Sequence, residues 1–152
     1  MNSFSLRRFI NNDVYMNNAN IKILSCDELM IISMSYPFLC IVNTDERYLP
    51  GKHWICIYID ENKYCIFWDS LGLPPHSYKK YFMQFIDRYC EGYCYLNEPL
   101  QAKNTQTCGL YCLYFLYYIC RHENVNSILY NLNNTQLNET IIRKFYDMYL
   151  TI

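Results

Sequence analysis

The sequence has little net charge, because its 13 basic and 14 acidic side chains leave a formal charge of -1. It therefore lacks the strong positive field with which a protein binds nucleic acid by charge alone, although a local basic face is still compatible with it. It also lacks a long apolar run. The longest, around residues 110–120, is well short of the roughly 20 residues that span a bilayer, so we expect no transmembrane segment.

The first residues, MNSFSLRRF, lack the apolar segment of a secretory signal. Nine cysteines would suit the disulfide framework of a secreted protein, but nine is odd. Several of them lie inside apolar runs, namely Cys40, Cys56, Cys65, Cys112 and Cys120. Reduced, mostly buried thiols fit this pattern better, and we expect a protein that is not secreted.

The chain shows no internal repeat and no linker. With 152 residues, of which 52% are hydrophobic, it is long enough for one well-filled core and too short for two ordinary domains. We expect a single domain over residues 1–152 and a monomer.

Three runs rich in Ile, Val, Tyr, Phe and Trp predict strands at 38–43, 53–59 and 64–69. Four polar residues, 60–63, separate the last two, which indicates an antiparallel hairpin. Pairing Ile59 with Tyr64 places His53 and Asp69 at the same end of the ribbon. The two side chains would face each other only after a one-residue slip or bulge, because side chains alternate between the faces of a strand.

Helices are predicted on both sides of these strands. Ser25 and Glu28 form a capping-box pattern for a short helix that ends before Pro37. Helical spacing of apolar residues predicts amphipathic helices over 77–91 and 138–150, with a short strand at 93–96. The segment 108–121 is apolar almost all round and so predicts a helix in the centre of the domain. Residues 1–24 show no clean period.

Cys108 lies where a polar loop becomes the buried helix, so its sulfur would sit at the positive N-terminal end of that helix. The helix dipole and free amides there favour a thiolate. Gly109 after it allows a substrate or another backbone to approach closely. Position alone, however, favours Cys108 as one more core cysteine.

A thiol nucleophile needs a base, and the chain has only three histidines. His76 follows a Pro-Pro turn and His122 lies between charged neighbours, where surface histidines are ordinary. His53 opens a strand and is the better candidate. Asp69 would hold its imidazole in the tautomer that presents a free nitrogen to the thiol. The alternative for Asp69 is a residue that caps the turn after its strand.

The oxyanion of a tetrahedral intermediate needs donors beside the nucleophile. Gln101 lies in the loop that leads to Cys108, and its side-chain amide is a candidate donor with the Cys108 backbone N–H. Gln106 competes for that role. A different reading takes Cys90, Cys94, Cys108 and Cys112 as four thiolate ligands of zinc, but ordinary packing explains Cys112 more simply.

These residues resemble a known family. The blocks GKHW, FWDSLG and LQAKNTQTCGLYC occur in the order found in adenain, the adenovirus maturation protease. The resemblance covers about 38–120, and Asp69, where adenovirus enzymes carry Glu, is more like the adenain-type proteases of Polinton/Maverick elements and adintoviruses. SUMO-deconjugating proteases belong to the same wider clan. Carried over by position, His53, Asp69 and Cys108 match the triad, Gln101 matches the oxyanion glutamine, and Trp54 matches the aromatic beside the substrate cleft.

The resemblance implies an α+β, papain-like fold with a central mixed sheet of about five strands, and the nucleophile at the N-terminus of a buried helix. It implies a cysteine endopeptidase that cleaves viral precursor proteins at glycine-containing sites, inside the virion or the host cell. It also implies activation by a disulfide-linked viral peptide, with Cys90 or Cys94 as the linking residue, and by DNA, which the near-neutral charge disfavours. No cofactor or metal is expected for the chemistry itself.

Two alternatives stay open. A protease that removes ubiquitin or a ubiquitin-like modifier would use the same residues and the same glycine-selective cleft. A non-enzymatic interaction protein would keep this fold for packing alone, but the presence of all four candidate residues disfavours that reading.

Overall fold

The computed structural model describes residues 1–150. Its centre is a five-stranded sheet in the order β1-β2-β3-β4-β5. The strands are β1 (Lys22–Ser25), β2 (Phe38–Asn43), β3 (Trp54–Ile59), β4 (Tyr64–Trp68) and β5 (Gly92–Tyr95). The three central strands pair antiparallel, whereas β1 and β5 run parallel to their neighbours β2 and β4, so the sheet is mixed.

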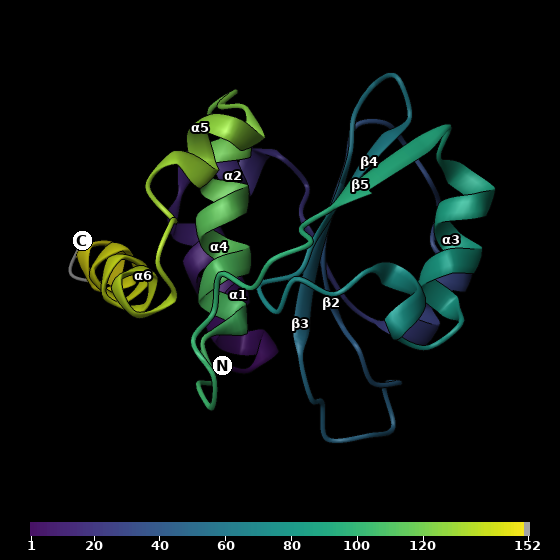
Figure 1. The fold of residues 1–152 in the computed structure, drawn as a ribbon. Coiled ribbons are helices and arrows are strands. Elements are labelled where there is room, and N and C mark those ends of the chain that lie inside the picture. Colours follow the sequence, from purple (N-terminus) through teal and green to yellow (C-terminus); the bar gives the residue numbers. More distant parts are fainter. Residues whose placement is uncertain (151–152) are drawn as a thin grey trace.

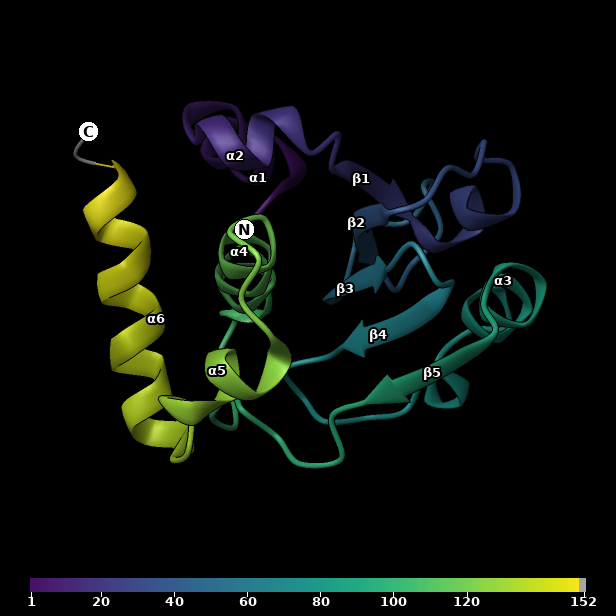
Figure 2. The ribbon, with the colours of Figure 1, turned by 90° about the horizontal axis from the view of Figure 1, so that it is seen from above.

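Helices cover both faces of the sheet (Figure 1). They are α1 (Ser3–Asn12), α2 (Val14–Asn18), α3 (Tyr81–Tyr89), α4 (Cys108–Ile119), α5 (Val125–Tyr130) and α6 (Thr135–Leu150), with 3₁₀ turns η1 (Cys26–Met30) and η2 (Pro75–Ser77). Figure 2 shows the layers from above: α4 lies between the sheet and α6, and α3 covers the other face. This arrangement confirms the predicted α+β fold.

The apolar side chains form one cluster on each face of the sheet. All six residues of β2 are buried, because both faces of that strand are covered. Helix α4 contributes a continuous set of buried residues from Gly109 to Leu116, as its all-round apolar sequence predicts. The Phe115 ring of α4 stacks on Trp68 of β4 with ring centroids 4.4 Å apart, and this contact joins helix to sheet.

Replacing Phe115 by alanine should lower the free energy of unfolding by about 3–5 kcal/mol, because the lost ring leaves a cavity in a fully buried contact. Chemical denaturation followed by the fluorescence of the two tryptophans measures this change. Tyr130→Ala is the control, since that ring is 81% exposed, and it should change stability by less than about 0.5 kcal/mol. Equal stability of both variants would contradict the tight packing of α4 on the sheet.

The structure differs from the predicted elements in the first third of the chain. Residues 1–24, which show no clean period, form α1, α2 and most of β1. The helix predicted from Ser25 is only the turn η1, although its capping box does form and the Ser25 amide donates to Glu28 at 2.7 Å. After Met30 the chain is not helical, and it returns to the end of the sheet where β2 begins, because β2 runs parallel to β1.

Smaller differences occur in the second half. Helix α3 begins at Tyr81 rather than at residue 77, because Pro75–Ser77 form a separate 3₁₀ turn. Helix α5 is not predicted by the sequence, and α6 begins three residues earlier than expected. Within residues 1–150, no helix combines the length and apolarity that crossing a bilayer requires.

The register of the hairpin decides which side chains meet at its end. Ile59 pairs with Cys65, one residue beyond the predicted partner Tyr64, and Cys56 pairs with Trp68. Continued by one step, this register sets residue 55 opposite residue 69. Because residues two apart share a face of a strand, His53 and Asp69 lie on the same side of the ribbon. The one-residue slip that their meeting requires is therefore present.

Candidate active site

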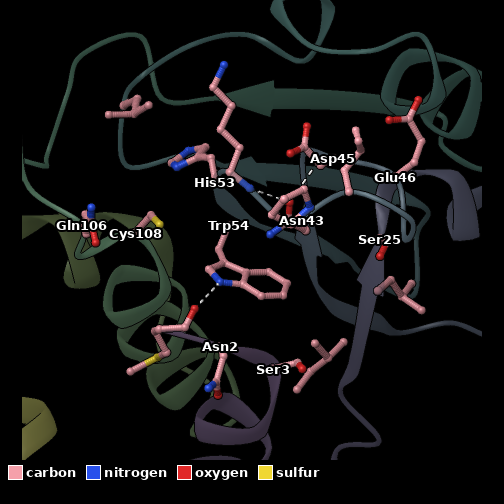
Figure 3. A pocket seen from close by; sticks show the side chains of 18 of the residues that line it. Asn2, Ser3, Ser25, Asn43, Asp45, Glu46, His53, Trp54, Gln106 and Cys108 are labelled. Carbon is pink, nitrogen blue, oxygen red and sulfur yellow. Dashed lines mark hydrogen bonds between the residues drawn. The ribbon is translucent and has the colours of Figure 1, made fainter.

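The predicted site residues meet in a cleft between the end of the sheet and the N-terminus of α4. Figure 3 shows His53, Trp54 and Cys108 around this hollow, and Gln101 also lines it. The cleft continues past Ser25 and Asn43 toward the loop that carries Asp45. The fold thus joins residues from the start of β3, the loop between β5 and α4, and the first residue of α4 at one place.

His53 and Asp69 form a buried pair. His53 Nε2 lies 2.7 Å from Asp69 Oδ1, and the two residues are 9% and 0% exposed. Asp69 also accepts hydrogen bonds from the amides of Leu71 and Leu73, at 3.0 and 3.2 Å. Asp69 therefore caps the turn after β4 and also holds the imidazole. The capping role and the orienting role that the sequence suggested for Asp69 are both compatible with these contacts.

The surroundings of His53 favour its protonated form. Burial lowers the pKa of the imidazole, but the hydrogen bonds to Asp69 and Cys108 and the charges of both residues outweigh it, so the pKa rises from 6.5 to about 9. Since Nε2 is bonded to Asp69, Nδ1 is the ring nitrogen left for the thiol. An imidazolium held beside a sulfur is the arrangement that stabilises a thiolate.

Cys108 is the first residue of α4, and its pKa shifts in the opposite direction. Burial raises the pKa of the thiol, but the hydrogen bond with His53 and the backbone amides of Trp54 and Gly109 lower it below its ordinary value. Thr107, the N-cap of α4, makes no side-chain bond to the first turn. The positive end of the helix is thus turned toward the sulfur rather than satisfied by its cap.

Gln101 is buried, with 5% exposure, and its amide has a fixed orientation. Ser70 Oγ donates to Gln101 Oε1 at 2.7 Å, and Gln101 Nε2 donates to the Thr105 carbonyl at 2.9 Å. One N–H of the amide remains beyond that bond, and the residue lines the same cleft as Cys108. The competing donor, Gln106, also lines the cleft but is exposed.

Trp54 lines the cleft beside Cys108, and Gly109 is buried against it. The Trp54 indole N–H donates to the Met1 carbonyl at 2.9 Å, a contact drawn in Figure 3. A Cβ added to Gly109 would lie 3.1 Å from Met1 Sδ and 3.4 Å from Trp54 Cδ1. A side chain at position 109 would therefore press on Met1 and meet Trp54 at an ordinary contact distance.

The comparisons with known proteins bear on the fold. Neither a protein-family model nor a curated protein sequence matches the chain. Among solved structures, it is similar to the ASFV pS273R protease, with a TM-score of 0.66 and 14% identity over 96% of this chain and 66% of that one. It is also similar to ChlaDub1 from Chlamydia trachomatis, with a TM-score of 0.51 and 16% identity over 66% of this chain and 47% of that one.

The chain has the fold of these two proteins. It spans 66% of the length of the first and 47% of the second. At this low identity the similarity concerns architecture, and the roles of individual side chains rest on the geometry of this chain. The catalytic roles of His53, Asp69, Cys108 and Gln101 stay predictions.

The remaining cysteines lie apart from the cleft. Cys90 follows α3 and is half-buried, and Cys94 is exposed on the edge strand β5. Within the described residues 1–150, no three His, Cys, Asp or Glu side chains converge to hold a metal ion. The four-cysteine zinc site is thus not formed by these residues.

Two further side chains contact the site residues, and the sequence reasoning missed both. Ser70 holds the Gln101 amide, and the Tyr78 hydroxyl donates to Asp69 Oδ2 at 2.6 Å. The block FWDSLG includes Ser70, so its place beside Asp69 was a usable signal. Tyr78 carried no such signal, because its spacing fits the apolar face of the predicted helix.

Proposed function

We propose that the chain is a cysteine endopeptidase in which Cys108 is the nucleophile, His53 the acid and base, and Asp69 the residue that orients His53. The observation that carries the proposal is the buried bond between His53 Nε2 and Asp69 Oδ1 beside a thiol whose pKa is lowered. A nucleophile, a base within reach of it and a third group that fixes the base are the parts of such a site.

The proposed reaction begins with the Cys108 thiolate attacking the carbonyl carbon of the scissile peptide bond. The carbonyl electron pair moves to oxygen, and the Gln101 amide with the Cys108 backbone N–H would stabilise this oxyanion. His53 then gives its proton to the leaving amine nitrogen as the C–N bond breaks, which leaves a thioester. Water attacks the thioester while His53 takes its proton, and the acid product leaves as the thiolate is restored.

The proposed substrates are viral precursor proteins cut at glycine-containing sites, inside a virion or a host cell. The family resemblance of the His-Trp, Asp-Ser and Cys-Gly blocks supports this choice. One structural neighbour is a viral protein named as a protease.

A ubiquitin-like modifier is the second candidate substrate. The observation that favours it is the similarity to ChlaDub1, a deubiquitinase. Incubation with a capsid precursor and with modifier conjugates separates the two. Cleavage of the precursor is the expected outcome, and cleavage of the conjugates alone would replace the viral substrate with the modifier.

Selective alkylation tests the site itself. Cys90 and Cys108 are the two thiols whose pKa is lowered, Cys90 by its hydrogen bond with Cys65 and Cys108 by that with His53. Iodoacetamide should label both before the buried cysteines. His53→Ala should slow labelling of Cys108 by about 10-fold or more at pH 7, because the thiolate loses its imidazolium partner. Labelling of Cys90 should stay unchanged, which makes it the internal control in peptide mass spectrometry. Unchanged labelling of both thiols would contradict the Cys108–His53 pair.

Activation by a peptide or by DNA stays a prediction from the resemblance. A disulfide to the peptide would use Cys90 or Cys94, of which Cys94 is the more exposed. Assays of the chain with added peptide or DNA, with Cys90→Ser and Cys94→Ser as separate variants, would identify the linking residue.

A further inference from the structure

The C-terminal helix α6 holds a buried carboxylate that the proposed chemistry does not use. Glu139 is 9% exposed, although most acidic side chains on helices face water. Its oxygen Oε1 accepts hydrogen bonds from the Ala102 amide and the Thr107 hydroxyl, both at 3.0 Å. The hydroxyls of Tyr111 and Thr105 lie 3.1 and 3.3 Å from the same oxygen.

All four of these partners belong to the loop before α4 or to the first turn of that helix. Ala102 follows Gln101 directly, and Thr107 precedes Cys108 directly. Thr105 supplies the carbonyl that accepts from the Gln101 amide. One carboxylate oxygen therefore bonds to both ends of the segment that separates the proposed oxyanion donor from the proposed nucleophile. It also lies beside the middle of that segment, where the Thr105 hydroxyl has a nearer acceptor in the Ala102 carbonyl at 2.8 Å.

The bond to Thr107 accompanies an irregularity of α4. Threonine at the N-cap of a helix ordinarily uses its hydroxyl to accept from the first-turn amides. Here the Thr107 hydroxyl donates to Glu139, and no side chain caps the first turn. The amides beside Cys108 are therefore left without a side-chain acceptor at the place where the oxyanion would form.

The two oxygens of Glu139 differ. Oε1 gathers all the contacts above, whereas Oε2 is buried and has no hydrogen-bond partner within residues 1–150. A buried polar atom without a partner is unfavourable and is rare in folded proteins. Because the loop uses only Oε1, an amide side chain could take the same position, with its carbonyl on the loop and its nitrogen in place of Oε2.

We propose that Glu139 is a positioning residue for the oxyanion hole: its Oε1 clamps the loop 101–107 so that Gln101 stays in place relative to Cys108. The proposal rests on the proposed function and extends it to α6. Loss of the clamp would displace the donors from the oxyanion while leaving the Cys108–His53 pair intact, because Glu139 contacts neither of those two residues in any bond given above.

The test compares Glu139→Ala with Glu139→Gln on a peptide substrate that the wild type cleaves. Glu139→Ala should lower kcat by about 10²-fold, since small misplacements of catalytic donors have effects of this size. KM should change by less than about twofold, because the clamp acts on the transition state rather than on substrate binding. Glu139→Gln should keep kcat within about threefold of the wild type, because its carbonyl replaces Oε1.

Alkylation of Cys108 by iodoacetamide supplies the second readout, since that reaction needs the thiolate and no oxyanion hole. Its rate and pH dependence should be the same in wild type and Glu139→Ala. Thr140→Ala, exposed and next to Glu139 on α6, is the matched control and should be unchanged in both assays. If Glu139→Ala does not fold, Thr107→Val removes one of the bonds to Oε1 and should lower kcat by about 10-fold at constant KM.

Three results would overturn the proposal: full kcat in Glu139→Ala, full kcat in Thr107→Val, or an alkylation rate in Glu139→Ala that falls as far as kcat. The last result would mean that Glu139 acts on the Cys108–His53 pair rather than on the oxyanion hole. Failure of the proposed function would look different, because wild-type turnover would then be absent or would survive Cys108→Ala.

Discussion

Replacing Cys108 by alanine is expected to abolish turnover. Removal of a nucleophile that works as a unit with its base lowers kcat by about 10⁶-fold in serine proteases, and little besides binding and the oxyanion hole is left. The same loss is expected here, because Cys108 is the thiol that interacts with the His53 imidazole. The assay is hydrolysis of a peptide with a glycine-containing site, with kcat and KM measured separately.

The matched control is Cys120→Ala, which removes another half-buried cysteine, next to the end of the same helix. It should keep kcat within about threefold, because a surface-near substitution away from the site acts on stability alone. Cys108→Ala should remain folded, since the residue is the first of α4 and lies outside the buried set of that helix. Turnover that survives the substitution would identify the wrong thiol.

The middle of the sheet was predictable from the sequence, whereas its register was not. The strands at 38–43, 54–59 and 64–68 lie within one residue of their predicted bounds, because β-branched and aromatic residues fill them. The register differs because Asp60 pairs with Tyr64 and Lys63 adopts a left-handed φ of 63°. The loop thus has three residues rather than four, and this shifts the pairing by one.

The N-terminal region was not predictable from its pattern. Helix α1 buries only three of its ten residues, Leu6, Phe9 and Ile10, and asparagines fill much of the sequence around them. Strand β1 is four residues long and pairs parallel with β2, a long-range contact that no local pattern encodes. Tertiary packing decides both elements.

The candidate site likewise has residues that the sequence predicts and residues that only the fold reveals. Cys108, His53 and Asp69 were reached from residue type, position and the family blocks, since the chain has only three histidines to choose from. Tyr78 contacts Asp69 from nine positions away in the sequence, and Glu139 contacts its partners from 28 or more positions away. Only the fold makes these residues neighbours of the site. A sequence pattern therefore finds the reacting groups more readily than the groups that hold them.

Replacing Asp69 by asparagine is expected to have the next largest effect on kcat and to leave some activity. The Asp69 carboxylate accepts from His53 Nε2 with one oxygen and from the Tyr78 hydroxyl with the other. An amide can replace only one of the two acceptors. Where its nitrogen faces His53, the imidazole takes the other tautomer and cannot accept the thiol proton, a change that lowers kcat by about 10⁴-fold in a serine protease.

The pH dependence separates this effect from a loss of folding. The alkaline limb of kcat/KM reports loss of the His53 proton, which the folded protein holds up to about pH 9. Both the hydrogen bond to Asp69 and its charge raise that pKa, so Asp69→Asn should move the limb toward lower pH. In stability, the raised pKa favours the folded wild type below pH 6.5, and this contribution is lost as the pH rises through about 9.

Tyr78→Phe is the control for Asp69→Asn, because it removes one bond to the carboxylate and leaves the His53–Asp69 bond in place. It should keep the alkaline limb near pH 9 and lower kcat by less than about 10-fold. An alkaline limb that stays in the same place in Asp69→Asn would mean that Asp69 only caps the turn after β4. A limb that moves in Asp69→Asn and stays in Tyr78→Phe would assign the raised pKa of His53 to that one carboxylate.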